Sequence, residues 1–306
     1  MPVMISHDTS IDYDVQGSGP PLLLIGGLGF GRWCWFKQLP ELSQHFRTIT
    51  FDIRGEQSAK HGVNDLAAEV EALLSHLSVK NTHVLGTSLG GFIAQELALN
   101  RPYLVNRLIL VCTSYGRGPE PVSPQAVGRM LGWGSFTPES TVRRGLEMAT
   151  SDAYRAGQPQ EFEQLVHWRL ADSPSVSTYY EELMAGAQFD ISRDVGNVIS
   201  PTLVIHGTED RYVPLANASA LAEAIPKAKL HVFEGAGHLV FIEKAEEVNK
   251  EVVSFLKPPK PQQKRRSQRP EKQQEETKAP KPTGRLRGLF RNPRGWASKV
   301  RRWLSR

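Results

Sequence analysis

Hydrophobic residues in this chain alternate between short apolar runs and longer stretches with helical spacing. Runs such as PLLLIGG at 21–27 are nearly all apolar and end in glycines, which is typical of strands buried on both faces. The predicted strands are 11–15, 21–27, 47–52, 82–88, 106–114, 201–207 and 229–235. The predicted helices are 64–77, 89–100, 215–224 and 243–256. This alternation predicts an α/β fold with a mostly parallel central sheet flanked by helices.

The alternation breaks once, between about 116 and 194. This stretch begins rich in Gly, Pro and Ser and then becomes helical and aromatic, with Trp133, Phe136, Trp168, Tyr179, Tyr180 and Phe189. Because it lies between two core strands, we interpret it as a helical cap inserted into a core formed by 1–115 and 195–256. Its aromatics can shape an apolar pocket, and Trp133 and Trp168 are our substrate-binding candidates. The alternative is that they pack the cap's own small core.

Charge divides the chain into two parts. Of 37 Lys+Arg and 32 Asp+Glu, 17 and 3 fall in residues 257–306, which leaves 20 and 29 in residues 1–256. The basic end begins with a segment rich in Pro, Gln and charge, so 257–283 is predicted to be a disordered linker. The full chain is 40% hydrophobic, and its acidic body is long enough for one sizeable core.

Targeting signals are not evident in the sequence. The first residues lack a basic flank followed by an apolar run, and no apolar stretch approaches the roughly 20 residues of a membrane span. The only cysteines, Cys34 and Cys112, are too few for a disulfide framework or a zinc motif and fit a reducing compartment. We therefore expect a cytoplasmic protein without a metal site.

The sequence Gly-Thr-Ser-Leu-Gly at 86–90 fits the pattern G-x-S-x-G. The pattern alone is weak, but here it follows a buried strand and opens a helix, the context that a nucleophile elbow requires. Its glycines allow a tight turn that presents Ser88 in a strained conformation, while the amide of Leu89 faces an oxyanion from the helix N-terminus. The alternative is an ordinary N-cap serine.

A serine nucleophile needs a base and an acid. His238 follows the last predicted strand in EGAGHLVFIE, and Asp210 follows another strand in GTEDRYVP. Catalytic groups gather at such carboxyl ends of strands, and the order Ser, Asp, His is the one described for α/β-hydrolases. A surface-loop histidine is the alternative for His238, and Glu209 competes with Asp210 for the role of the acid.

A second oxyanion amide is expected from the loop Gly26-Gly27-Leu28-Gly29. Its glycines permit a close approach of the backbone to a substrate, so we assign Leu28 N–H to the oxyanion hole and Gly27 to the substrate site. The alternative is a plain glycine-rich turn. The loop is not a dinucleotide site, because G-x-G-x-x-G is incomplete and no acidic residue follows at the required distance.

The chain resembles the α/β-hydrolase superfamily, in the group of small esterases, enol-lactonases, C–C hydrolases, proline iminopeptidases and ring-type haloperoxidases. The matching elements occur in the family's order over about residues 10–256: IGGLGFGRWCW at 25–35, FDIRG at 51–55, LGTSLGG at 85–91, PTLVIHGTEDRYVP at 201–214 and GAGHLVFIE at 235–243. The resemblance implies a Ser-Asp-His triad under a helical cap. Two departures concern the pocket wall: Gly26-Gly27 where many members have His-Gly, and Glu56-Gln57 where many have a second glycine.

The function expected from these features is hydrolysis of an ester-type bond in a small apolar substrate, as in a carboxylesterase or lactonase. The mechanism needs no cofactor. Two alternatives remain open: the same machinery acting on a peptide, thioester or C–C bond, and a non-catalytic ligand-binding protein on the hydrolase fold.

The end of the chain, 284–306, has its own pattern. Leucine, phenylalanine, valine and two tryptophans recur at helical spacing, and Arg and Lys fill much of the remaining circumference. A basic amphipathic helix with tryptophans on its apolar side indicates an anchor to an anionic membrane surface. We favour this interpretation over binding to nucleic acid, docking to an acidic protein, or a solvated tail without a role.

Overall fold

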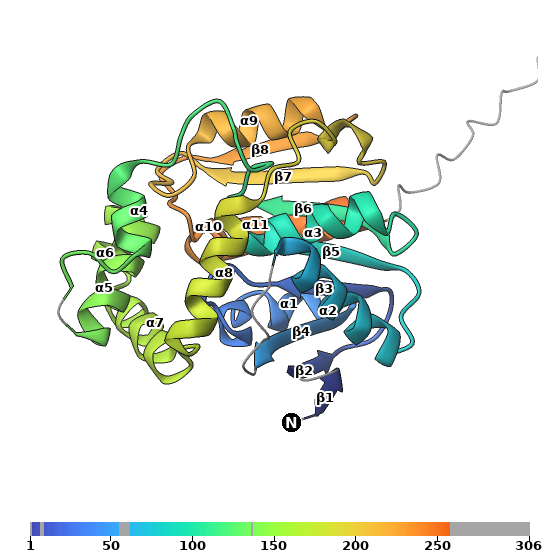
Figure 1. Cartoon of the computed structure of the whole chain (residues 1–306), viewed down its shortest axis with the longest axis horizontal. Helices are drawn as coiled ribbons and strands as arrows, with labels where there is room; N and C mark the ends of the chain where they lie inside the picture. Colours follow the sequence, from blue (N-terminus) through green and yellow to red (C-terminus); the bar gives the residue numbers. More distant parts are fainter. Residues whose placement is uncertain (1, 7–8, 55–61, 136, 258–306) are drawn as a thin grey trace, which may run out of the picture. The chain divides into compact units, whose positions relative to one another are not determined.

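A computed structural model of the chain describes residues 2–6, 9–54, 62–135 and 137–257. Its centre is an eight-stranded sheet in the order β1-β2-β4-β3-β5-β6-β7-β8 (Figure 1). The strands are β1 (Val3–Ser6), β2 (Thr9–Gln16), β3 (Pro21–Ile25), β4 (Arg47–Arg54), β5 (Thr82–Thr87), β6 (Val105–Val111), β7 (Thr202–Gly207) and β8 (Lys229–Phe233). Each predicted strand is present, and β1 is one that the sequence pattern missed.

Strand direction changes only at the β2 edge of the sheet. Strand β2 pairs antiparallel with β1 and β4, while β4, β3, β5, β6, β7 and β8 pair in parallel. The chain leaves β3 for β4 on one side and then returns to β5 on the other side. Strand order therefore reverses at β3, and ligands of open α/β sheets bind outside the carboxyl ends of the strands at such a point.

The sheet has an apolar core on each face. Alternate side chains of β3 point to opposite faces, as strand geometry requires: Leu23 and Ile25 join one cluster, and Leu22 and Leu24 join the other. All four are 2% exposed or less. This explains why PLLLI is continuously apolar, since both of its faces are covered.

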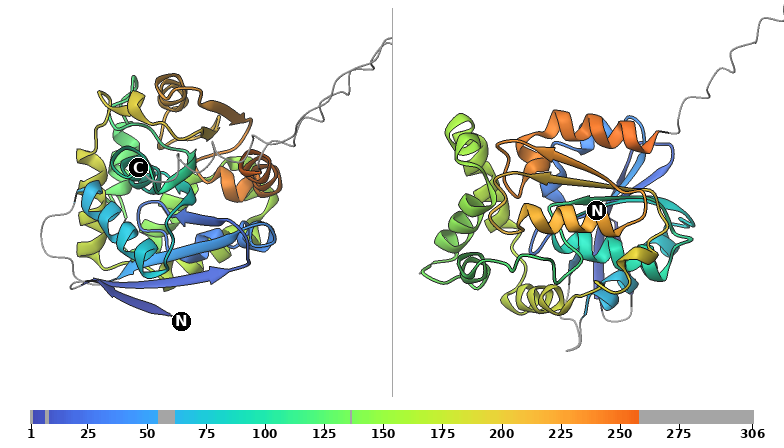
Figure 2. Two further views of the ribbon diagram at one scale, coloured as in Figure 1. Left: turned by 90° about the vertical axis from the view of Figure 1, so that its right-hand side faces the viewer. Right: turned by 90° about the horizontal axis from the view of Figure 1, so that it is seen from above.

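Helices cover the two faces of the sheet (Figure 2). The cluster that contains Leu23 receives α2 (Val63–His76), α3 (Leu89–Asn100), η2 (Val195–Asn197) and α9 (Leu215–Ala224). The cluster that contains Leu22 receives η1 (Arg32–Trp35), α1 (Leu39–Leu42), α10 (Val240–Glu243) and α11 (Ala245–Leu256). The predicted layered α/β architecture is therefore confirmed.

Five helices lie between β6 and β7, within the segment expected as an insertion (Figure 1). They are α4 (Pro124–Met130), α5 (Pro138–Ala149), α6 (Asp152–Gly157), α7 (Pro159–Ala171) and α8 (Val176–Gln188). We call them the inserted helices. Local sequence defines where they begin: the side chains of Ser123, Thr137, Ser151 and Ser175 each accept a hydrogen bond from a first-turn amide.

The two ends of this insertion meet. Ile191 N–H donates to the Tyr115 carbonyl over 3.0 Å. A Cβ added to Gly116 would lie 2.2 Å from the Phe189 carbonyl oxygen. The chain thus leaves the sheet after β6 and returns beside its point of departure.

Several predicted features lie outside the described residues. They are the linker from residue 258 onward, the amphipathic helix at 284–306, Glu56, Gln57 and Phe136. Within the residues that the structure does describe, no helix has the length and apolar character needed to cross a membrane.

Candidate active site

Ser88 occupies the turn between β5 and α3. Its backbone has φ +53° and ψ −118°, a combination that a residue with a side chain adopts only when its surroundings impose it. Close backbone contacts surround it: a Cβ on Gly86 would lie 2.2 Å from the Gly90 carbonyl, and one on Gly90 would lie 2.3 Å from the Ile25 carbonyl. The Ser88 side chain makes no capping hydrogen bond to α3. The sequence alternative of an ordinary N-cap serine therefore does not describe this turn.

Asp210 and His238 meet at the carboxyl ends of β7 and β8. His238 Nδ1 lies 2.8 Å from Asp210 Oδ2. The other carboxylate oxygen, Oδ1, accepts the backbone N–H groups of Tyr212 and Val213 over 2.8 and 2.9 Å. With Nδ1–H donated to Asp210, the Nε2 atom of His238 carries the free lone pair of a base. Glu209, the competing candidate, is exposed next to this pair.

The Asp210 carboxyl is fully buried yet ionised. Burial raises its pKa, but the charge and hydrogen bond of His238 outweigh burial and hold the pKa below its ordinary value. A second imidazole, His206, contributes: its Nε2 lies 3.5 Å from Asp210 Oδ2 and 3.0 Å from the Val213 carbonyl. Burial lowers the pKa of His206, while the charge of Asp210 acts in the opposite direction.

Glu243 of α10 fixes the loop that carries His238. Its Oε1 accepts the N–H of Gly237 over 3.1 Å, and its Oε2 accepts the Ser151 hydroxyl over 2.6 Å. On the other side of the histidine, Leu239 N–H donates to the Ala149 carbonyl over 3.0 Å. The His238 loop is therefore tied on both sides to the junction between α5 and α6.

The glycine loop after β3 lies against Ser88. A Cβ on Gly27 would lie 3.2 Å from Ser88 Cβ and 3.8 Å from its Oγ. Leu28 follows Gly27, and Leu89 is the buried first residue of α3, where the partial positive charge of a helix N-terminus is concentrated. The loop is thus next to the serine, as expected, and the assignment of Leu28 and Leu89 as oxyanion donors stays a prediction.

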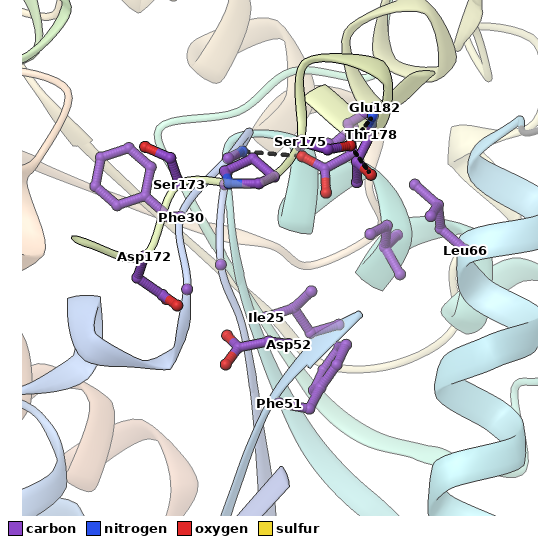
Figure 3. A pocket seen from close by; sticks show the side chains of 17 residues that line it. Ile25, Phe30, Phe51, Asp52, Leu66, Asp172, Ser173, Ser175, Thr178 and Glu182 are labelled. Carbon is purple, nitrogen blue, oxygen red and sulfur yellow. Dashed lines mark hydrogen bonds between the residues drawn. The ribbon is translucent and has the colours of Figure 1, made fainter. Parts of the chain in front are cut away.

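A cavity of about 300 Å³ adjoins this turn (Figure 3). Core residues form one wall, which is apolar except for Asp52, and residues of the turn between α7 and α8 and of α8 itself form the other, mostly polar wall. The core residues are Ile25, Gly26, Gly27, Gly29, Phe30, Gly31, Phe51, Asp52, Leu66, Leu89 and Ile93, and the inserted residues are Asp172, Ser173, Pro174, Ser175, Thr178 and Glu182. Gly27 and Leu89, the neighbours of Ser88, connect the cavity to the serine turn.

Glu182 links the inserted helices to the glycine loop. Its Oε2 accepts the N–H of Gly29 over 2.9 Å (Figure 3). Burial raises the pKa of Glu182 to about 7, while the Gly29 hydrogen bond and the charge of Arg169 act in the opposite direction. The guanidinium of Arg169 also lies near this loop, 5.9 Å from the centre of the Phe30 ring. Side chains of α7 and α8 thus contact the loop that carries Leu28.

Comparison with known proteins decides the family. Residues 20–245 match the family model described as alpha/beta hydrolase fold. The chain belongs to the α/β-hydrolase family. Among solved structures, the enol-lactonase from Burkholderia xenovorans LB400 superposes with a TM-score of 0.73 at 25% identity, covering 83% of this chain and 99% of that one. The predicted family and fold are confirmed.

Sequence relatives of this α/β-hydrolase are hydrolases of several bonds. A putative carbamate hydrolase RutD of Agrobacterium fabrum (strain C58 / ATCC 33970) is 29% identical over 80% of this chain and 98% of its own length. A pimeloyl-[acyl-carrier protein] methyl ester esterase of Aliivibrio fischeri (strain MJ11) is 30% identical over 81% and 98%. These relatives support an enzyme that hydrolyses an ester or amide bond.

Trp133 and Trp168 have different surroundings in this α/β-hydrolase. Trp168 packs against Trp33 and Phe36, with ring centres 6.1 and 4.9 Å apart, whereas Trp133 is 66% exposed. Neither lines the cavity of Figure 3. Their role in substrate binding stays a prediction, and the structure gives Trp168 a packing role between the insertion and the core.

Sequence reasoning missed three site residues of this α/β-hydrolase: His206, Glu243 and Glu182. His206 stands inside an apolar strand run, IHG, where a polar residue is unusual, so that position carried a usable signal. Glu243 and Glu182 lie on helices among other charged residues, and nothing in the sequence marked them as site residues. Their contacts are set by the tertiary packing.

Proposed function

We propose that this α/β-hydrolase is a serine hydrolase of carboxylic esters or lactones, with Ser88 as nucleophile, His238 as base and Asp210 as acid. The observation that carries the proposal is the backbone of Ser88. A serine held at φ +53° with its hydroxyl left out of helix capping is a strained arrangement, and such strain is retained where function needs it. The hydrogen bond between His238 and Asp210 supplies the remaining partners.

The mechanism uses only side chains and amides of this chain. His238 Nε2 takes the hydroxyl proton as Ser88 Oγ attacks the carbonyl carbon, and Asp210 stabilises the imidazolium that forms. The amides of Leu28 and Leu89 donate to the tetrahedral oxyanion, and each such donor is typically worth about 3 kcal/mol. His238 then protonates the leaving alcohol, an acyl-enzyme remains on Ser88, and water repeats the sequence in reverse.

The bond type is proposed from the relatives and the cavity together. A methyl ester esterase and an enol-lactonase act on carboxylic esters, and half of the cavity wall is apolar, which fits a small apolar acyl or alkyl group. A carbamate hydrolase among the relatives supports the same machinery acting on an amide-like bond. The polar groups of the α7–α8 turn and of α8 then give the substrate its orientation.

Labelling by a fluorophosphonate tests the nucleophile without any choice of substrate. We expect stoichiometric labelling of the wild type, complete loss in Ser88→Ala and at least about a thousandfold slower labelling in His238→Ala. Circular dichroism shows whether the variants are folded. A folded wild type that stays unlabelled contradicts the proposal and favours the non-catalytic binding protein.

A substrate panel then separates the bond types. Methyl and p-nitrophenyl esters of short acids, five- and six-membered lactones, carbamates and peptide amides are compared by kcat/KM on the wild type and on Ser88→Ala. We expect the esters or lactones to exceed the amides by at least about tenfold. A preference for carbamates or peptide amides would replace the ester proposal and keep the nucleophile.

We further propose that residues 284–306 bind an anionic membrane surface, so that a cytoplasmic enzyme is held at the bilayer. The support is the sequence pattern, since each basic residue near an anionic surface is worth about 1 kcal/mol. Sedimentation of the full chain with vesicles of phosphatidylcholine and phosphatidylserine, compared with vesicles of phosphatidylcholine alone, tests it. We expect binding by the full chain and none by residues 1–256. Equal binding by both contradicts it, and retention on RNA in place of vesicles would favour nucleic acid.

A further inference from the structure

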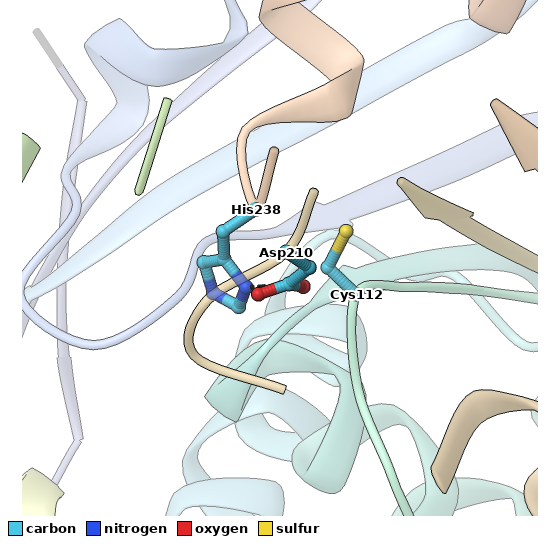
Figure 4. A group of neighbouring side chains, drawn as sticks. All are labelled: Cys112, Asp210 and His238. Carbon is cyan, nitrogen blue, oxygen red and sulfur yellow. Dashed lines mark hydrogen bonds and ion pairs between the residues drawn. The ribbon is translucent and has the colours of Figure 1, made fainter. Parts of the chain in front are cut away.

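Cys112 lies beside the Asp210–His238 pair (Figure 4). It follows the last residue of β6, has φ +48° and is fully buried. Its Sγ lies 3.9 Å from the Gly237 carbonyl oxygen. One ligand atom from each of Cys112, Asp210 and His238 lies within 4.8 Å of the other two. The proposed catalytic mechanism has no use for this thiol.

We propose that Cys112, Asp210 and His238 form a site for one borderline-soft divalent cation of the Zn²⁺ class, which turns the enzyme off. Thiolate, carboxylate and imidazole are the three ligand types that Zn²⁺ prefers. The charges balance, because the thiolate and the carboxylate together neutralise the +2 ion inside a buried site. The three side chains come from the ends of three different strands, so sequence spacing gave no sign of the site.

The geometry requires small movements only. Zn²⁺ binds sulfur at about 2.3 Å and nitrogen or oxygen at about 2.0–2.2 Å, so its tetrahedral ligand atoms stand roughly 3.3–3.8 Å apart. Asp210 Oδ2 and His238 Nδ1, now 2.8 Å apart, would separate slightly, while Cys112 Sγ approaches from within 4.8 Å. Asp210 Oδ1 keeps its two backbone donors throughout, and water completes the fourth position.

Binding releases one proton. The Cys112 thiol loses its proton to solvent as the metal–sulfur bond forms. The ion replaces the proton between His238 Nδ1 and Asp210 Oδ2, and the imidazole stays neutral by carrying its proton on Nε2 instead. Nε2–H can no longer accept the Ser88 proton. This consequence for turnover rests on the proposed serine hydrolase, whereas the binding of the ion does not.

Cadmium titration tests the site directly. Cd²⁺ is the probe, because a cadmium–thiolate bond absorbs in the ultraviolet, and Ser88→Ala is the protein used for this measurement, so that catalysis plays no part. We expect one equivalent of cadmium–thiolate absorption, which is absent in Ser88→Ala combined with Cys112→Ala. Cys34→Ala is the matched control, since Cys34 is the other buried thiol, and this variant is expected to keep the absorption.

Inhibition of the Ser88-intact protein gives the second readout. We expect Zn²⁺ to abolish fluorophosphonate labelling, EDTA to restore it, and Cys112→Ala to raise the inhibitory concentration at least about tenfold. If the alanine variant does not fold, Cys112→Ser, which has a hard oxygen in place of sulfur, replaces it in this measurement. Absence of the absorption, its loss in Cys34→Ala, or unchanged zinc sensitivity in both Cys112 variants overturns the proposal. If the absorption is observed but the metal-free protein is not labelled, the proposed serine hydrolase is contradicted and the cation site is supported.

Discussion

The strand ends and the inserted helices of this α/β-hydrolase build their parts of the site in opposite ways. At the strand ends, backbone geometry decides: the turn at Ser88 is strained, and Asp210 is held by the amides two and three residues further on. In the inserted helices, side chains decide: Glu182 reaches a loop 153 residues away in the sequence. Groups fixed by their own local chain can be recognised from sequence, whereas groups fixed by distant packing cannot.

This difference has an energetic side. A side chain that is oriented by neighbouring amides keeps its position when a distant helix shifts. A side chain that reaches across an interface depends on every contact of that interface. Variants in the two regions should therefore fail differently: those at the strand ends should lose kcat, and those in the inserted helices should lose stability or change pH dependence.

The largest effect is expected at Asp210. Replacing it with Asn leaves the shape intact but offers His238 an N–H in place of an anion, so the imidazole takes the wrong tautomer, and kcat should fall by about 10⁴-fold. Glu209→Gln is the matched control and should keep kcat within about twofold. Steady-state kinetics on the best substrate measures both. Loss of activity in the Glu209 variant with an active Asp210 variant would reverse the assignment.

Variants of Trp168 test the packing contact between the insertion and the core. Trp168→Ala removes the contacts with Trp33 and Phe36 and should lower the free energy of unfolding by about 3 kcal/mol, measured in urea. Trp133→Ala, at a 66% exposed position, should change it by less than about 0.5 kcal/mol. A large rise in KM with unchanged stability in either variant would instead support the substrate-binding role predicted from sequence.

Glu243, on α10 of the core, tests whether its bridge between the His238 loop and Ser151 of the insertion positions the histidine. Glu243→Ala removes the acceptor shared by Gly237 N–H and the Ser151 hydroxyl and should lower kcat about tenfold with little change in KM, about 1.4 kcal/mol of transition-state stabilisation. Glu243→Gln retains an acceptor oxygen and should recover most of the loss. Equal losses in both variants, or a change confined to KM, would show that Glu243 does not position His238.

The smallest effect concerns pH and Glu182. The unfolded carboxyl loses its proton near pH 4.5 and the folded one near pH 7, so the folded state binds more protons between these values. Stability should therefore fall as pH rises from about 4.5 to about 7 and then level off. Glu182→Gln should remove this fall and be more stable than the wild type at pH 8 by about 1 kcal/mol, less than the full shift implies because the side chain lines an open cavity.

Urea unfolding at pH 5 and pH 8 measures this difference. Glu181→Gln, one residue away on the same helix, is the control and should follow the wild type at both values. If Glu182→Gln and the wild type show the same pH dependence, the Glu182 carboxyl is ionised in the folded state at pH 5, and the contact with Gly29 N–H is an ordinary charge-assisted hydrogen bond.

Sequence predicted the fold well because each core strand carries its own signal. The buried strand before Ser88 and the glycines around the serine are local features that predict the turn, and Asp210 likewise follows the buried strand β7. Strand β1 was missed because Met4 is buried whereas its neighbours Val3 and Ile5 are 51% and 79% exposed. An edge strand that lies mostly in solvent leaves almost no pattern to read.

The polar half of the cavity could not be predicted. Asp172, Ser175 and Glu182 look like residues of solvated helices and turns, and they face the site only because α7 and α8 turn back over the glycine loop. Nothing in their spacing distinguishes them from the exposed charges nearby. The sequence therefore indicated an apolar pocket, while the cavity next to Ser88 has one wall that is apolar except for Asp52 and one that is mostly polar.

The hydrogen bond from Ile191 to Tyr115 makes the insertion a module. A segment whose two ends meet at one point of the sheet can lengthen, shrink or be exchanged between relatives without altering the register of any strand. The inserted wall of the cavity can thus change during evolution as one segment, while the strands that carry the proposed nucleophile, base and acid stay unaltered. Protein engineers who graft the insertion of another α/β-hydrolase at the same junction need to keep that closing contact, the hydrogen bond of Glu182 to the glycine loop and the bonds that tie the His238 loop to the α5–α6 junction.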